Sequence, residues 1–185
     1  MAIYFIRHGQ SEFNAAFNGK IDPMIFDPAL TKLGLEQAES ARVNILKLGI
    51  HRVITSPFTR AIQTAKIMFD GISPIEVQLG HHELLLHSSD IGRHPSDLKE
   101  SFPDLTFEHI PYSWWYKNST YGSTIEKEPL ELFKERMSRF VIALDQIKDE
   151  NIAIVGHGNA FKEILDLKLD NCLLYTSPSP RDVEE

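Results

Sequence analysis

Short runs of apolar residues, rich in branched and aromatic side chains, recur at residues 2–6, 51–55, 74–79 and 151–155. Each run ends at a cluster that contains glycine or proline, which is typical of short strands. Between the runs lie longer stretches whose apolar residues recur every three or four positions, as in helices that bury one face. This alternation favours an α/β fold.

Local signals mark the ends of several predicted helices. Thr31 fits an N-cap, and Gly49 fits the glycine that often follows a helix. Ser56 fits a second N-cap, with Pro57 at the first helical position, where its missing N–H costs nothing. The predicted helices cover residues 31–48, 56–65, 96–102, 129–144 and 159–169.

Two stretches interrupt this alternation. Residues 15–28 are polar and contain two Asp-Pro pairs, so we expect a loop over the edge of the sheet. Residues from about 80 to 129 form a segment inserted between core elements. Its aromatic side chains form either a lid over a substrate or, as we favour, a small satellite core. They are Tyr112, Trp114, Trp115, Tyr116 and Tyr121.

Length and charge narrow the class of protein. The 185 residues predict one domain over residues 1–170, and 19 basic against 26 acidic side chains, a net charge of −7, argue against a nucleic-acid partner. A single cysteine, Cys172, allows neither an intrachain disulfide nor a thiolate metal cluster. Without a membrane-length apolar run or a signal peptide, we expect a cytoplasmic protein with no membrane partner. Monomer and homodimer both remain open.

The last stretch, residues 171–185, differs from the rest of the chain. Residues 172–175 fit a final edge strand, but the Ser-Pro repeats that follow predict an end to the strand and then disorder. Residues 172–182 resemble a translated sequencing adapter, so we expect the natural C-terminus to be missing or replaced. We expect no chemical role for this stretch.

The end of the first predicted strand carries the strongest chemical signal. Arg7, His8 and Gly9 follow it, and in open α/β sheets ligands bind at the carboxyl ends of the strands. Gly9 lets the main chain turn sharply, and Arg7 offers a planar fork of donors suited to phosphate. His8 can act as a nucleophile or carry a proton near neutral pH.

Two later segments repeat this logic. Gly156, His157 and Gly158 follow the strand at residues 151–155. Arg60 lies in the first turn of a predicted helix, where free N–H groups and the helix dipole favour an anion. The sequence therefore predicts an anion site at one edge of the sheet.

Glu83 follows the third predicted strand and allows a second interpretation, a metal site shared with His81, His82 and His87. Adjacent histidines on an extended segment point to opposite faces, and their spacing fits no zinc motif. We therefore favour an acidic site residue without a metal.

Further motifs accompany these residues in the first third of the chain: Asn14, Leu30-Thr31, Gly34, Gln37-Ala38, Ser56-Pro57 and Gln63-Thr64-Ala65. With Arg7-His8-Gly9 and Arg60, they resemble the histidine phosphatase superfamily, and more closely its phosphoglycerate-mutase-like branch, over about residues 1–170. The resemblance implies a three-layer α/β/α fold with a mostly parallel central sheet and an inserted lid segment. It also implies that no cofactor is needed.

The resemblance assigns roles to single residues. It implies that His8 attacks phosphorus and becomes phosphohistidine, and that Glu83 protonates the leaving alcohol. The residues implied to hold the phosphoryl group are Arg7, Arg60 and His157. Those implied to complete the substrate-binding site are Asn14, Gly158 and Gln10. Because the cations are part of the chain, no metal is implied.

Three functions remain open, all with a small phosphorylated ligand. A phosphatase of small phosphate monoesters is favoured, because Asp90-Ile91-Gly92-Arg93 and Trp114-Trp115 resemble the small, broad-specificity members. A phosphoglycerate-mutase-type phosphotransferase is the first alternative, but mutases have a longer insertion and a glutamate in place of Gln10. A non-catalytic phosphate-binding module of the same fold is the second.

Overall fold

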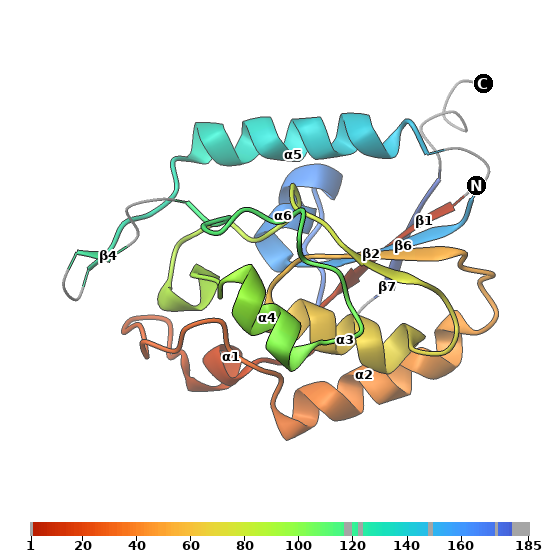
Figure 1. Cartoon of the computed structure of the whole chain (residues 1–185), viewed down its shortest axis with the longest axis horizontal. Helices are drawn as coiled ribbons and strands as arrows, with labels where there is room; N and C mark the ends of the chain where they lie inside the picture. The colour runs from red at the N-terminus through yellow and green to blue at the C-terminus, as the bar shows by residue number, and fades with distance from the viewer. Residues whose placement is uncertain (1, 117–119, 122–123, 148–149, 173, 179–185) are drawn as a thin grey trace.

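A five-stranded sheet with helices on both faces organises the chain (Figure 1). The computed structural model describes residues 2–116, 120–121, 124–147, 150–172 and 174–178. The sheet has the order β3-β2-β6-β1-β7, in which β7 is antiparallel to β1 and the other pairs are parallel. Its strands are β1 (Ala2–Arg7), β2 (Arg52–Thr55), β3 (Ile75–Val77), β6 (Ile152–Gly156) and β7 (Leu174–Pro178).

Two pairs of helices cover the sheet and confirm the three-layer α/β/α fold. They are α2 (Lys32–Ile45) and α3 (Thr59–Phe69) on one face, and α5 (Leu130–Leu144) and α6 (Gly158–Leu165) on the other (Figure 1). Successive side chains of a strand point to opposite faces, so β1 serves both layers. Tyr4 and Ile6 join the core under α2 and α3, while Ile3 and Phe5 join the core under α5 and α6.

The inserted segment folds on one end of the sheet. Its elements are a 3₁₀ turn (Ser88–Asp90), α4 (Pro95–Ser101), β4 (Thr120–Tyr121) and β5 (Thr124–Ile125). Trp114 is buried in a satellite core with Leu98 and Phe107, and Phe58 from the main domain joins them. For Trp114 the satellite-core interpretation is therefore right, whereas the side chain of Tyr121 lies outside the described residues.

The start of α3 corrects a prediction. The helix begins at Thr59, and its N-cap is Phe58 instead of Ser56. Asp27, from the loop before α2, takes over the capping role: its carboxylate accepts from the Thr59 N–H at 2.9 Å and from the Thr59 hydroxyl at 2.5 Å. A cap from a distant segment satisfies the same free N–H as a local one, but no local pattern announces it.

The end of the chain corrects a second prediction. β7 continues past Tyr175 through Thr176 to Pro178, where we expected the strand to end. Edge strands tolerate proline because one side of their main chain has no partner strand. Residues 179–185, where we also expected disorder, lie outside the described residues.

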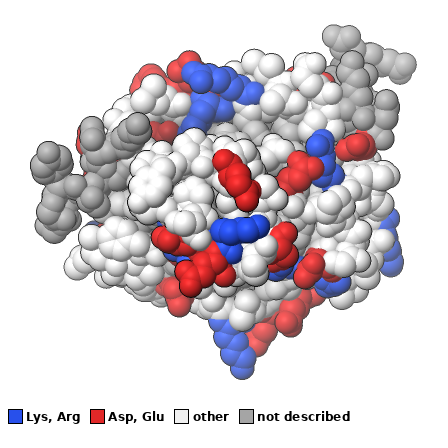
Figure 2. Space-filling view, viewed as in Figure 1, with Lys and Arg blue, Asp and Glu red and all other residues white. Residues whose placement is uncertain are grey.

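The surface agrees with the overall acidic charge. Figure 2 shows acidic and basic side chains interspersed over one described face, without a broad basic area. Among the described residues, no helix combines the length and the apolar character that crossing a membrane requires.

Candidate active site

Parallel pairing brings three strand ends to one edge of the sheet. Arg7 pairs with Gly156 at the ends of β1 and β6, and the His8 N–H donates to the Gly156 carbonyl at 3.0 Å. On the other side of β6, the Ser56 N–H donates to the Val155 carbonyl at 3.2 Å. The residues that follow β1, β6 and β2 therefore lie next to one another, although they are far apart in the sequence.

A close contact between two glycines fixes the turn after β1. A Cβ on Gly9 would lie 2.5 Å from the Gly34 carbonyl oxygen, and a Cβ on Gly34 would lie 2.1 Å from the Gln10 carbonyl oxygen. Only glycine permits this approach. The turn is thereby held against the first turn of α2, where Thr31 donates from its N–H to the Gln10 carbonyl at 2.9 Å.

The His8 ring is buried in a defined orientation. Its Nδ1 lies 2.7 Å from the Gly9 carbonyl, which can only accept, so Nδ1 carries the proton. Its Nε2 then presents a lone pair, toward which Arg60 Nε donates at 3.3 Å. Burial, followed by the charges of Arg60 and Arg7, lowers the pKa of His8 well below its usual value. The ring is therefore neutral at physiological pH.

Arg60 is buried in the first turn of α3 and faces several acceptors. It donates from Nη1 to the Ser89 carbonyl at 2.7 Å and from Nη2 to Asp90 Oδ1 at 3.2 Å. Its guanidinium carbon also lies 4.4 Å from the centre of the Phe58 ring. The buried ion pair with Asp90 holds Arg60 at the cavity, a role that no sequence pattern indicates for Asp90.

Arg7 and His157 flank His8. Arg7 donates from Nη1 to the Leu169 carbonyl at 2.9 Å, and its Nε is buried without a hydrogen-bond partner among the described residues. The His157 ring centre lies 5.2 Å from that of His8, and its Nε2 shares a hydrogen bond of 2.8 Å with the Ser56 hydroxyl. Burial, with the charge of Arg60, lowers the pKa of His157 well below its usual value.

Glu83 carries a buried carboxyl. It accepts from the Leu84 N–H at 2.9 Å and from the Asn159 N–H at 3.1 Å. Asn159 lies at the start of α6, where main-chain N–H groups have no partner within the helix. Burial, followed by the negative charge of Asp90, raises the pKa of Glu83. A carboxyl with a raised pKa can keep a proton to donate.

These groups enclose a cavity of about 160 Å³. This volume is smaller than that of a typical drug-sized pocket and suits a phosphoryl group with a short substituent. The lining residues are Arg7, His8, Ser11, Phe13, Asn14, Arg60, Glu83, Leu86, His87, Ser89, Asp90 and Asn159.

The predicted site residues occupy different places relative to this cavity. Arg7, His8, Asn14, Arg60 and Glu83 line it. His157 lies beside His8, and a Cβ on Gly158 would lie 3.4 Å from Arg7 Nε.

Gln10 is not brought to the cavity. Its side-chain oxygen accepts from the Thr31 hydroxyl at 2.8 Å, so it faces the start of α2. The structure thus gives Gln10 a contact with the scaffold where the resemblance implied substrate binding.

The metal alternative finds no support in the geometry. No group of three or more His, Cys, Asp or Glu within the described ranges is arranged to hold a metal ion. His81 Nε2 contacts the Val155 carbonyl at 3.2 Å, and its ring stacks on Phe140 at 4.6 Å between centres. Burial lowers the pKa of His81 to about 4. This histidine belongs to the core.

The segment before β7 supports the main chain at the site. Asn171 donates from its side chain to the His8 carbonyl at 2.7 Å, and the Cys172 N–H donates to the Arg7 carbonyl at 2.9 Å. Both contacts hold the main chain that carries the two cavity residues.

Comparisons with known proteins identify the family. The model of the histidine phosphatase superfamily (branch 1) matches residues 3–174, so the chain belongs to this superfamily. The adenosylcobalamin/alpha-ribazole phosphatase of Salmonella typhimurium is 26% identical over 162 residues, covering 85% of this chain and 74% of the relative. Phosphoglycerate mutase-like protein 1 of Arabidopsis thaliana is 26% identical over 204 aligned positions, covering 92% and 72%.

A solved structure supports the fold. The alpha-ribazole phosphatase of Shigella flexneri superposes with a TM-score of 0.66 at 21% identity, covering 95% of this chain and 89% of that chain. The mostly parallel sheet and its helical layers are therefore those of known histidine phosphatases.

Proposed function

We propose that this protein is a phosphatase that hydrolyses small phosphate monoesters through a phosphohistidine. One observation carries the proposal: a buried, neutral His8 presents its Nε2 lone pair to a small cavity that two arginines and a buried carboxyl also line. A nucleophile, fixed positive charge and a proton donor are the groups that phosphoryl transfer requires.

The first half of the reaction transfers the phosphoryl group to the protein. His8 Nε2 forms a bond to phosphorus while the ester P–O bond breaks, and Glu83 gives its proton to the leaving oxygen. Arg60, which donates to His8 Nε2 at 3.3 Å in the free protein, turns its donors to the phosphoryl oxygens. Arg7 supplies to the same group its buried Nε, which has no partner within the described part of the chain.

The second half releases phosphate. Glu83, now ionised, takes a proton from water while the water oxygen attacks phosphorus and the N–P bond breaks. His8 returns to its neutral form, because Nδ1 keeps its proton and donates it in a hydrogen bond to the Gly9 carbonyl throughout the reaction. The positive charge comes from Arg7 and Arg60, so we propose that the reaction needs no metal ion.

Two basic side chains of the insertion make contacts that favour hydrolysis over a mutase reaction. A mutase has to bind a second charged group beside the transferred phosphoryl group. Arg93 donates to Asp27, Ser101 and Thr59, and Lys99 donates to the Leu105 carbonyl at 2.7 Å. Arg93 and Lys99 are therefore engaged outside the cavity and do not offer it positive charge for a second charged group. The relative from Salmonella typhimurium and the solved structure from Shigella flexneri are both named as alpha-ribazole phosphatases, which supports a small monoester as substrate.

The test measures p-nitrophenyl phosphate hydrolysis with a chelator present. We expect the wild type to be active and His8→Ala to lose at least about 10³-fold, as expected for a missing nucleophile. His51→Ala removes an exposed histidine outside the cavity and is expected to keep activity. An acid-labile phosphoenzyme should form in the wild type and in His51→Ala, but not in His8→Ala. Activity that the chelator abolishes, or that His8→Ala retains, would contradict the proposal.

A further inference from the structure

A partly buried arginine outside the cavity holds the segment that carries Glu83. Between β3 and the 3₁₀ turn, residues 78–87 form neither helix nor strand. Main-chain carbonyls in such a segment need donors from elsewhere when they are buried. The side chain of Arg136, in the middle of α5, supplies them.

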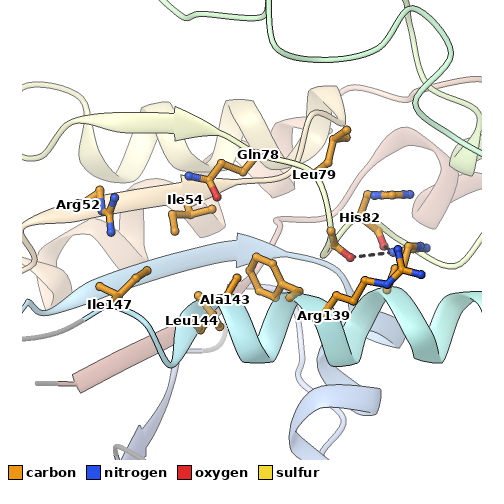
Figure 3. Close-up of a pocket in the computed structure, with 12 residues that line it drawn as sticks. Arg52, Ile54, Gln78, Leu79, His82, Arg139, Ala143, Leu144 and Ile147 are labelled. Carbon is orange, nitrogen blue, oxygen red and sulfur yellow. Dashed lines mark hydrogen bonds between the residues drawn. The ribbon is translucent and has the colours of Figure 1, made fainter.

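Arg136 uses all three of its nitrogens on this segment and on one carboxylate. Nη1 donates to the carbonyls of Gly80 at 3.1 Å and of His82 at 2.6 Å, contacts that Figure 3 draws as dashed lines. Nη2 donates to the Glu83 carbonyl at 3.0 Å and to Glu128 Oε2 at 2.8 Å, and Nε donates to Glu128 Oε1 at 2.9 Å. These five bonds match the five N–H donors of a guanidinium.

Glu128 holds the same segment from the other side of Glu83. Its N–H donates to the Leu85 carbonyl at 2.9 Å, and its carboxylate accepts from the Leu85 N–H at 3.3 Å. Only 6% of the Glu128 side chain and 16% of the Arg136 side chain are exposed. The ion pair therefore fixes the main chain on both sides of Glu83.

The arrangement explains how an irregular segment can present a carboxyl reproducibly. The Glu83 side chain makes two hydrogen bonds from N–H groups, at Leu84 and Asn159, and both depend on where the main chain of residue 83 lies. Misplacement by about 1 Å can cost a catalytic group about 100-fold in rate.

We propose that Arg136 and Glu128 are positioning residues that hold the Glu83 carboxyl at the cavity in the orientation needed to protonate the leaving oxygen. This inference rests on the proposed phosphatase reaction and adds two residues that lie outside the cavity. Neither residue touches the substrate.

The leaving group provides a selective test. p-Nitrophenolate leaves readily without a proton, whereas an alkoxide needs one, so a misplaced acid slows hydrolysis of propyl phosphate far more than of p-nitrophenyl phosphate. For Arg136→Met we expect kcat/KM to fall about 100-fold on propyl phosphate and no more than about threefold on p-nitrophenyl phosphate. Inhibition by orthophosphate should not change, because Arg7, His8 and Arg60 remain in place.

Matched variants separate this role from a general loss of stability. Arg139→Met removes an exposed arginine from the next turn of α5 and should behave as the wild type. Glu83→Gln should show the same leaving-group pattern as Arg136→Met, and the double variant should lose no more than Glu83→Gln alone. Glu128→Gln keeps an acceptor for the Leu85 N–H, so it should show a smaller selective loss on propyl phosphate. This variant replaces Arg136→Met in the test if Arg136→Met does not fold.

An NMR titration of the Glu83 carboxyl measures its pKa, which reports on its surroundings independently of catalytic activity. Burial keeps the pKa of Glu83 raised, so releasing the segment in Arg136→Met should lower it toward the usual value. The charged groups that face Glu83, namely Asp90, Arg60 and Arg7, are kept in this variant. Wild-type protein without hydrolysis would contradict the proposed function, while the titration still tests the positioning role. Equal losses on both substrates, additive losses in the double variant, or an unchanged titration would overturn the inference.

Discussion

Orthophosphate should stabilise the folded protein strongly. Two arginines and two histidines are gathered at one sheet edge, and buried nitrogens of Arg7 and His157 have no hydrogen-bond partner among the described residues. An anion that satisfies these groups binds the folded state alone. At a free concentration one hundred times the dissociation constant, such binding adds about 2.7 kcal/mol to the free energy of unfolding. For a domain of 185 residues, Tm should rise by about 5–11 °C.

The assay is a thermal melt with a phosphate series, with Kd measured separately by titration calorimetry and chloride matched for ionic strength. Arg60→Met should lose most of the phosphate-dependent rise at the same concentration. Lys32→Met removes one positive charge at an exposed site and should keep the full rise. If wild-type Tm does not change over the series, or if Arg60→Met shows the same rise as Lys32→Met, then the cluster is not an anion site.

Three further predictions concern the surroundings of the site. Asp90→Asn removes the negative charge that helps raise the pKa of Glu83, so this pKa should fall and the alkaline limb of the propyl phosphate rate profile should move to lower pH. Gly34→Ala places a Cβ 2.1 Å from the Gln10 carbonyl oxygen, and the denaturation midpoint should report a loss of about 1–3 kcal/mol. Asp27→Ala uncaps α3, and chemical denaturation should show about 1–2 kcal/mol less stability.

Local patterns could predict the elements whose buried side chains recur at the period of a helix or a strand. The helix over residues 129–144 was predicted from apolar spacing. α5 begins one residue later, at Leu130, and ends at Leu144, with Phe133, Met137 and Phe140 buried. The gathering of His8 and His157 was predictable for a topological reason, because parallel strands bring their carboxyl ends to one edge.

Contacts between distant segments left no such pattern. The Asp27 cap on α3 joins residues 32 positions apart, and the Arg136 contact with Gly80 joins residues 56 positions apart. A charged residue in a polar loop or at one position of a helix looks the same in the sequence whether it is solvated or buried. β7 was shortened in the prediction because an edge strand is held by main-chain bonds to β1, which Ser and Pro side chains do not reveal.

One physical cause sets both protonation states that the proposed reaction needs. Burial disfavours charge, so it lowers the pKa of His8 and raises the pKa of Glu83 within the same cavity. His8 is neutral at any pH above its lowered value, and Glu83 is protonated at any pH below its raised value. Because the ordinary pKa of histidine lies above that of glutamate, these two opposite shifts favour the coexistence of a neutral nucleophile and a protonated donor. Substitutions that admit water to the cavity, even without touching either residue, should therefore narrow the pH range of this coexistence from both sides.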